Sequence, residues 1–335
     1  MNPTKSYVMK YMILVAALIL ISFLAICVGS VSIPLSDVFY AIFDRDVLSV
    51  NQLIIHSVRI PRVLGAALAG VGLSVSGVLL QLVMNNSLAA PNIIGVNSGA
   101  GLAVLCVLVF YPSYYYAIPF SAFFGALIAS LFVYLIAHTS SVSKVTVVLA
   151  GVAVSSLLNA VINAILLFFP NASIDVSSFM YGSLSGLTYS SISLPALLVI
   201  MIIILLFFLR NTYNILQLGD SLARSLGLRV NAIRFILILC SAMLAGSIVS
   251  YTGLLGFVGL IVPHIARRIV GYDAKRLIPF TAILGAFVVV ASDLIGRILF
   301  IPYEIPVGII MSFLGSPYFI YLLIRCRGGK THADV

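Results

Sequence analysis

Three arginines stand at the ends of long apolar segments, where a guanidinium group is costly to place. Arg59 and Arg62 flank Ile60-Pro61 directly before one such segment, and Arg297 closes another. Because proline is favoured at the first position of a helix, a helix that begins at Pro61 would point both nearby guanidinium groups the same way. Two uses fit these residues: docking of an acidic partner or ligand, and extension to lipid phosphates at the membrane surface.

A polar segment at residues 217–228 is the second feature that could do work. It is polar enough to leave the bilayer and regular enough to form a short helix. Asp220 lies near its start, Arg224 follows four residues later as a favourable helical pair, and Gly227 can end the helix. Such a helix could be a simple connector, or it could receive force from a soluble motor protein.

Residue patterns for other chemistry are lacking. Gly328-Gly329-Lys330-Thr331 resembles the end of a phosphate-binding loop, but Ile324 stands where that loop needs its first glycine. The four histidines are scattered, and no nucleophile elbow surrounds Ser98. We therefore expect a transport subunit with no catalytic, metal or cofactor site of its own, so any ATP must be hydrolysed by another chain.

The composition predicts a protein embedded in lipid. Of its 335 residues 62% are hydrophobic and only 8% are charged, and the mean hydropathy is +1.22. A soluble domain carries about 25% charged residues. The net charge of +9 does not indicate a nucleic-acid partner, because the basic residues form short clusters between apolar runs rather than one polar stripe.

The elements that must position these residues are about ten membrane-spanning helices in a single permease domain, residues 1–335. A span needs about 20 apolar residues. The candidates are 11–29, 63–83, 93–110, 118–137, 145–169, 192–209, 232–251, 254–269, 277–298 and 305–324. The third is short and begins after Pro91, and the eighth is short and interrupted by Pro263 and His264. Such broken helices are tolerated only where protein or a cavity surrounds the backbone.

The basic residues predict the orientation of these spans. With ten spans and both termini in the cytoplasm, 14 of the 18 basic residues lie inside, and the outer four are Arg45, Arg59, Arg62 and Arg297. Arginines on the outer side oppose the usual bias, so we favour docking over lipid contact for Arg59, Arg62 and Arg297. The first apolar run is too long for a signal-peptide core and reads as an uncleaved span.

A weak internal repeat adds a transporter signature. Leu68-Ala69-Gly70 is followed by Gly77, and Leu244-Ala245-Gly246 is followed by Gly253 at the same spacing. Five spans separate the two copies, so they would enter the membrane in opposite senses, as in inverted-repeat transporters. Small residues such as Gly70 and Gly77 predict close helix packing, with a role in lining a path as an additional possibility.

Eight segments, in order along the chain, form a recognisable set of motifs: Arg59-Ile60-Pro61-Arg62, Ser76-Gly77 with Gln81, 86–91, 95–100, 218–228, 256–264, 293–297 and 304–308. Together they resemble the FecCD-type permeases of ABC importers for iron-siderophore complexes, haem and cobalamin. The resemblance runs from about residue 11 to 325. One departure from the family pattern is Ser87, where the family usually has proline.

The resemblance implies two permease subunits, identical or paralogous, around a path in the bacterial cytoplasmic membrane. It implies two ABC ATPase subunits below and an extracytoplasmic substrate-binding protein or lipoprotein above, which would meet Arg59, Arg62 and Arg297. Residues 211–231 would form the loop that couples to the ATPase, carried by Gly219, Asp220, Ala223, Arg224, Leu226 and Gly227. Residues expected to pack or line the path are Gly70, Gly77, Pro91, Gly95, Gly99, Pro263 and His264.

The sequence leaves alternatives open for both the transported cargo and the energy source. Iron-siderophore complexes are the first prediction, and haem or cobalamin fit the same family. An ion-coupled secondary transporter is the alternative of a different class, for which Asp293 is the one candidate acidic residue within a span.

Overall fold

The computed structural model describes the chain except for residues 1–2, 30–32, 35–36, 39–48, 140–143 and 329–335. No β-strand occurs in this described part, which folds into helices. They are α1 (Pro3–Cys27), α3 (Val50–Ile54), η1 (Ile55–Arg59), α4 (Ile60–Val83), η2 (Pro91–Ile94), α5 (Val96–Phe110), α6 (Ala117–Thr139), α7 (Lys144–Phe168), α8 (Ala172–Tyr181), α9 (Tyr189–Phe208), α10 (Arg210–Leu216), α11 (Asp220–Ser225), α12 (Val230–Thr252), α13 (Val258–Val270), α14 (Ala274–Ile298) and α15 (Val307–Gly328).

Each of the ten predicted apolar segments overlaps one α-helix. Among the described residues, seven helices are long and apolar enough to cross a membrane. The apolar stretches Val96–Phe110 and Val307–Tyr321 are shorter, and α13 has 13 residues. The all-α, multi-span architecture is therefore confirmed, whereas a count of ten crossings is not.

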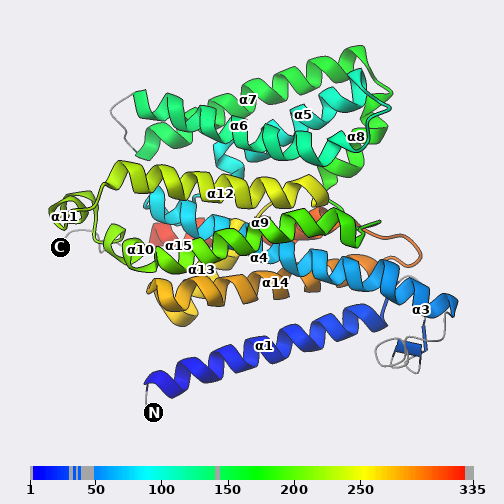
Figure 1. The fold of residues 1–335 in the computed structure, drawn as a ribbon, viewed down its shortest axis with the longest axis horizontal. Helices are drawn as coiled ribbons and strands as arrows, with labels where there is room; N and C mark the ends of the chain where they lie inside the picture. The colour runs from blue at the N-terminus through cyan, green and yellow to red at the C-terminus, as the bar shows by residue number, and fades with distance from the viewer. Residues whose placement is uncertain (1–2, 30–32, 35–36, 39–48, 140–143, 329–335) are drawn as a thin grey trace.

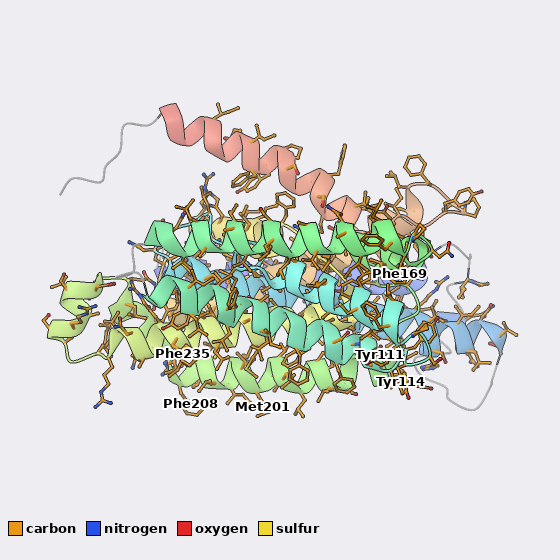
Figure 2. All side chains as sticks on the ribbon, turned by 90° about the horizontal axis from the view of Figure 1, so that it is seen from above. Tyr111, Tyr114, Phe169, Met201, Phe208 and Phe235 are labelled. Carbon is orange, nitrogen blue, oxygen red and sulfur yellow. The ribbon has the colours of Figure 1, made fainter. Side chains whose placement is uncertain are left out.

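The helices form a bundle with α4 near its centre (Figure 1). In the segment Val50–Val83, which contains α4, 78% of the 18-residue stretch with the highest hydropathy is buried, whereas the buried share of the corresponding stretch in α1 is 17%. Helices α5, α6 and α7 lie on one side of the centre and α1 lies on the opposite side (Figure 1). Figure 2 shows apolar side chains such as Met201 and Phe208 of α9 pointing outward, as a surface in contact with lipid requires.

Helix α4 contacts two neighbours through glycines two turns apart. A Cβ atom added to Gly70 would overlap the backbone oxygen of Gly285 in α14, and one added to Gly77 would overlap that of Gly259 in α13. Gly99 in α5 meets Gly125 in α6 in the same way. Without the hydrophobic effect between helices in lipid, such close backbone contact is what holds them together.

Helix α13 corrects the prediction that Pro263 interrupts its segment. The helix runs unbroken from Val258 to Val270 with Pro263 inside it. Proline has no N–H for the backbone oxygen four residues earlier, which here is that of Gly259. Gln81 of α4 takes over, since its Nε2 donates to the Gly259 oxygen at 3.4 Å. A neighbouring helix thus supplies the missing donor, as proline-containing membrane helices require.

Helices α4 and α12, which carry the two copies of the weak repeat, run antiparallel. Tyr251 Oη donates to the Gly65 oxygen at 2.8 Å near one end, and the hydroxyls of Ser76 and Ser241 are 2.7 Å apart farther along. The opposite senses match those expected of an inverted repeat. The two matching glycines differ in place, because Gly77 lies inside α4 while Gly253 follows the end of α12 with a φ of 69°.

Candidate functional site

Charged residues gather at the two ends of the bundle. At one end, the last turn of α1 meets Arg59 and Arg297. At the other end, Lys10 of α1 donates to the backbone oxygen of Ile269 at 2.8 Å, close to the start of α14, and α11 projects there as well (Figure 1). The two motifs singled out from the sequence therefore lie at opposite ends.

Five residues form the arginine cluster at the first end: Arg59, Arg62, Asp293, Arg297 and Glu304. Arg62 is its centre, because its Nε donates to both Asp293 carboxylate oxygens at 3.1 Å and its Nη2 donates to Oδ1 at 3.0 Å. Its Nη1 donates to Glu304 Oε2 at 2.7 Å. Arg62 thus joins α4 to α14 and to the turn before α15.

The other two arginines bind the C-terminal end of α1. Arg59 Nη1 donates to the backbone oxygens of Ile26 and Cys27 at 2.6 and 2.7 Å, and Arg297 Nη1 donates to that of Ala25 at 2.9 Å. These oxygens belong to the last turn of α1, where intrahelical donors are lacking and the helix dipole favours positive charge. Arg297 also lies 3.1 Å from Asp293 Oδ2 through its Nε.

The cluster is buried, whereas extension to lipid phosphates, the second use considered from the sequence, needs guanidinium groups that reach the membrane surface. Arg59 is 4% exposed, Arg62 7% and Arg297 3%. Within these five residues three guanidinium groups accompany two carboxylates, and the backbone oxygens at the end of α1 add acceptors for Arg59 and Arg297. Among the described residues, Arg297 Nη2 has no hydrogen-bond partner. The side chain of Glu304 is 28% exposed, which makes it the carboxylate of the cluster that reaches the surface.

The second end carries the α11 loop, residues 217–228, and it folds as the sequence predicts. Helix α11 spans Asp220–Ser225, and Gly227 follows with a φ of 84°. The amide of Gly227 donates to Arg224 and that of Leu228 to Ala223, which is the Schellman pattern of a glycine-terminated helix. Gly219 precedes the helix with a φ of 97°, another conformation that favours glycine.

One interaction of the α11 loop differs from the prediction. Asp220 accepts a hydrogen bond from Arg234 Nη2 of α12 at 2.6 Å, so the expected pair with Arg224 is wrong. Arg234 lies outside α11 and ties its start to the following span, whereas Arg224 stays exposed. The loop is therefore fixed to α12 at its base.

The free face of the α11 loop is apolar. Leu222 in α11 and Leu226 at its C-terminal cap are four residues apart and are 54% and 61% exposed, Leu218 before Gly219 is 57% exposed, and Ala223 faces inward and is fully buried. Residues four apart share a helix face. Exposed leucines on a helix outside the apolar spans are typical of a surface that meets another protein.

A model of the FecCD transport family matches residues 17–325. The chain belongs to this family. Among curated FecCD-type relatives, the Fe(3+)-citrate import system permease protein YfmE of Bacillus subtilis is 36% identical over 320 residues, which are 95% of this chain and 96% of the relative. The iron(3+)-hydroxamate import system permease protein FhuG of the same organism is also 36% identical, over 92% of this chain and 95% of its own length.

A solved structure of an inward-facing ABC transporter assigned to the metal-chelate type superposes with a TM-score of 0.82. It is 26% identical and covers 93% of this FecCD-family chain and 97% of its own. The resemblance drawn from the sequence motifs is thereby confirmed, and so is the helical permease fold.

The FecCD-family chain also links the α11 loop to the central helices. Asn214 of α10 donates through Nδ2 to Asp273 Oδ1 at 2.9 Å, and its Oδ1 accepts from the amide of Ala274. Asp273 caps α14, and the hydrogen bond from Asn214 lowers the pKa of its carboxyl group. A displacement of α10 would therefore reach α14, one of the helices that pack on α4.

The remaining predicted residues lie within the helices rather than at either charged end. Pro91 is buried at the start of η2, and Gly95 joins η2 to α5 with a φ of 81°. His264 is half-buried in α13 with its ring 6.2 Å from that of Tyr318, and its Nε2 has no hydrogen-bond partner in the described part of the chain. Where the structure is described, no three His, Cys, Asp or Glu side chains gather to hold a metal ion.

Sequence reasoning missed the roles of Asp293 and Glu304. The sequence marks Asp293 as a possible coupling residue and as part of a family motif, and it marks Glu304 as part of a family motif alone. One local signal existed for the first: Asp293 and Arg297 are four residues apart, so they share a face of α14. Nothing near Glu304 in the sequence marks its pairing with Arg62.

Proposed function

We propose that this chain is the permease subunit of a binding-protein-dependent ABC importer that carries ferric iron complexes of the siderophore or citrate class. The observation that carries the proposal is its similarity, over more than nine-tenths of its length, to permeases named for Fe(3+)-citrate and iron(3+)-hydroxamate import. The orientation follows the basic residues: the end with the α11 loop is cytoplasmic, as are both termini.

In this proposal two ATPase subunits and a second permease subunit, identical or paralogous, complete the transporter. Each ATPase holds one α11 loop through Leu222 and Leu226. ATP binding and hydrolysis move the loop, the Asn214–Asp273 contact passes that movement to α14, and the glycine contacts of α4 make the central helices move together. The path then opens alternately to the two sides of the membrane.

The arginine cluster is the proposed docking point for an extracytoplasmic binding protein through Arg59, Arg62 and Arg297. Because the arginines are buried, docking requires an exchange of partners within the cluster. In the structure Glu304 accepts a hydrogen bond from Nη1 of Arg62, and it is the partly exposed carboxylate of the cluster. A carboxylate of the binding protein would take its place, so docking would exchange one ion pair for another and depend on orientation more than on added affinity.

Reconstitution tests the function as a whole. We expect liposomes that contain the permease and its ATPase to import a ferric siderophore presented by the binding protein when ATP is supplied on the ATPase side. Liposomes with the permease alone are expected to import none, with ATP or with an imposed proton or sodium gradient. Import by the permease alone under an ion gradient would contradict the proposal and support a secondary transporter.

The structure already disfavours that alternative on one point. A proton-coupled carrier needs a titratable group within the membrane that gains and loses a proton. Asp293, the candidate in the sequence, forms ion pairs with Arg62 at 3.0 Å and with Arg297 at 3.1 Å, so both of its carboxylate oxygens already face a guanidinium group. Haem and cobalamin remain alternative cargoes, and competition by these compounds against the ferric siderophore in the same liposomes separates them.

The docking role makes a separate prediction at Glu304. In the Glu304→Gln variant, Arg62 loses the carboxylate that competes with the binding protein. We expect the binding protein to associate several-fold more tightly with detergent-solubilised transporter, as measured by surface plasmon resonance, because displacement of a charged hydrogen-bond partner is no longer required.

Asp220→Asn is the matched control, since it also removes a carboxylate paired with an arginine but at the opposite end. It should leave the association unchanged. Unchanged association in Glu304→Gln, with the binding protein otherwise competent, would show that the cluster holds helices together without docking a partner.

A further inference from the structure

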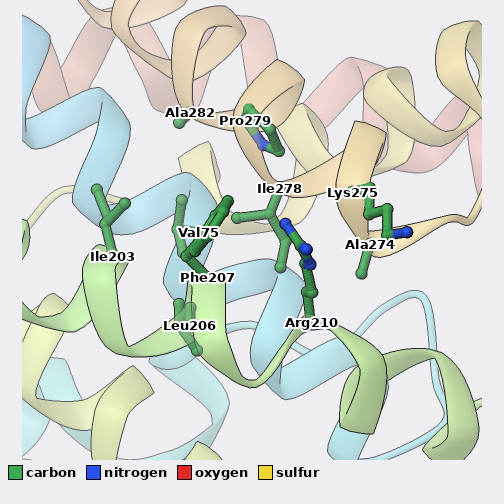
Figure 3. Close-up of a pocket in the computed structure, with 10 residues that line it drawn as sticks. All are labelled: Val75, Ile203, Leu206, Phe207, Arg210, Ala274, Lys275, Ile278, Pro279 and Ala282. Atoms are coloured by element: carbon green, nitrogen blue, oxygen red, sulfur yellow. The ribbon is translucent and has the colours of Figure 1, made fainter.

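An apolar groove with two basic residues at its rim lies between α9 and α14, with α4 at its floor (Figure 3). Its volume is about 250 Å³, and eight of its ten lining residues are apolar. Ile203, Phe207 and Ile278 are among them, and the two charged residues are Arg210 and Lys275. Neither the coupling loop nor the arginine cluster contributes to this groove.

The groove begins at the end of the bundle that carries the α11 loop and runs toward the middle. Lys275 and Ala274 lie in the first turn of α14, and Ala282 lies two turns farther. At 1.5 Å per residue, the seven residues from Lys275 to Ala282 span about 10 Å. Half of a bilayer's hydrocarbon core is about 15 Å thick. The groove therefore has the length of a segment of one lipid leaflet.

The walls of the groove open onto the lipid-facing surface. Phe207 is 60% exposed, and α9 has the highest mean hydropathy of the candidate spans, 2.9. At that depth no water is present to fill an apolar groove, so its occupant is itself apolar. A volume of about 250 Å³ suits a segment of hydrocarbon chain, because pockets that enclose whole drug-sized molecules are larger, about 300–1,000 Å³.

The two basic residues at the rim of the groove favour a negatively charged headgroup. In the described part of the chain, Arg210 and Lys275 form no ion pair with a carboxylate. Arg210 instead lies over the ring of Phe207, 4.4 Å from its centre, so its guanidinium group is held at the mouth of the groove (Figure 3). The nearby carboxylate of Asp273 accepts from Asn214 and from the amide of Lys275.

A second protein surface fits the groove less well. A second copy of this chain would need acidic groups at the same level. The described carboxylates at this end, Asp220 and Asp273, are already bonded to Arg234 and Asn214. An anionic phospholipid supplies both features at once, a phosphate for the basic rim and an acyl chain for the apolar walls, and basic pockets between spans on the cytoplasmic side bind such headgroups.

We propose that this groove is a binding site for an anionic phospholipid, with the phosphate between Arg210 and Lys275 and an acyl chain along α9 and α14. In the proposed orientation the lipid belongs to the inner leaflet. Arg210 begins α10, and α10 is bonded to the cap of α14 through Asn214. The lipid therefore holds the base of the α11 loop at the membrane surface.

The test compares lipid retention by the full-length permease. The purified chain in detergent is incubated with phosphatidylglycerol or phosphatidylcholine, and the lipid that remains bound is counted by native mass spectrometry. We expect wild type to retain phosphatidylglycerol, and the Arg210→Gln, Lys275→Gln variant to retain about tenfold less. The Arg229→Gln, Arg268→Gln variant is the matched control, since it removes two exposed arginines from the same end outside the groove, and it should retain as much as wild type.

A second variant tests the apolar half of the site. Ala282→Phe places a ring in the groove and leaves both basic residues intact, so we expect it to reduce phosphatidylglycerol retention as well. Circular dichroism and elution as a single species establish that each variant is folded. If the Arg210→Gln, Lys275→Gln variant does not fold, Lys275→Gln alone replaces it, because Lys275 is exposed. Equal losses in the Arg229→Gln, Arg268→Gln control would overturn the proposal, and so would full retention in Ala282→Phe. The proposal would also be overturned if the groove variants retained their lipid but lost the ATPase subunits in the assembled transporter. That result would assign the groove to a protein contact.

Discussion

The Asp293→Asn variant is expected to lower the free energy of unfolding by about 3–5 kcal/mol, because it leaves two buried guanidinium groups without their shared counter-charge. Asp293 receives three hydrogen bonds from Arg62 and lies 3.1 Å from Arg297, and its own exposure is 2%. The variant keeps the shape of the side chain, so the loss is one of charge. Because the chain has no tryptophan, unfolding in mixed micelles is followed by far-ultraviolet circular dichroism.

Asp220→Asn is the control, because it makes the same chemical change in an ion pair that is partly open to solvent. The side chains of Arg234 and Asp220 are 19% and 36% exposed, and such pairs contribute about 0–1 kcal/mol. Similar losses in the two variants would contradict the assignment of the arginine cluster as a buried unit. Combining Asp293→Asn with Arg62→Gln should cost less than the sum of the single changes, since the two residues are in direct contact.

The sequence predicted the helices far better than the contacts between them. An apolar run of about 20 residues in a chain that is 8% charged has to become a helix in lipid, since its backbone finds no other partners. The end of α11 could also be predicted from neighbouring residues, because Gly227 can adopt a positive φ at no steric cost. These predictions needed only residues that are close together in the chain.

The arginine cluster could not be predicted in this way. Arg62 is 231 residues from Asp293 and 242 from Glu304, and an arginine before an apolar segment looks the same whether it will be exposed or buried. The same limit applies to Pro263, whose missing donor is replaced by Gln81 on another helix. The pair of Asp220 with Arg234 instead of Arg224 has a similar cause, because the start of α12 lies beside the start of α11 and offers a second arginine.

A double variant of the α11 loop, Leu222→Glu with Leu226→Glu, is expected to abolish ATP-driven uptake while the permease still folds. Both leucines are more than half exposed, so placing charge there removes no buried contact. In protein interfaces a few apolar anchors dominate the binding energy, and the loss of two should weaken the ATPase complex about tenfold or more. Uptake in liposomes and co-purification of the ATPase are the two measurements.

Ser221→Glu with Ser225→Glu is the matched control, because it adds the same two charges at the same spacing on the same short helix. Ser221 and Ser225 are also exposed, but each lies one position before a leucine and so is turned by about 100° around the helix. If the ATPase binds the helix face that carries Leu222 and Leu226, the transporter with the serine variant retains the ATPase and most of the ATP-driven uptake. Equal losses in both variants would mean that negative charge near α11, rather than the loss of the leucines, disrupts the complex, and would contradict the coupling role assigned to Leu222 and Leu226.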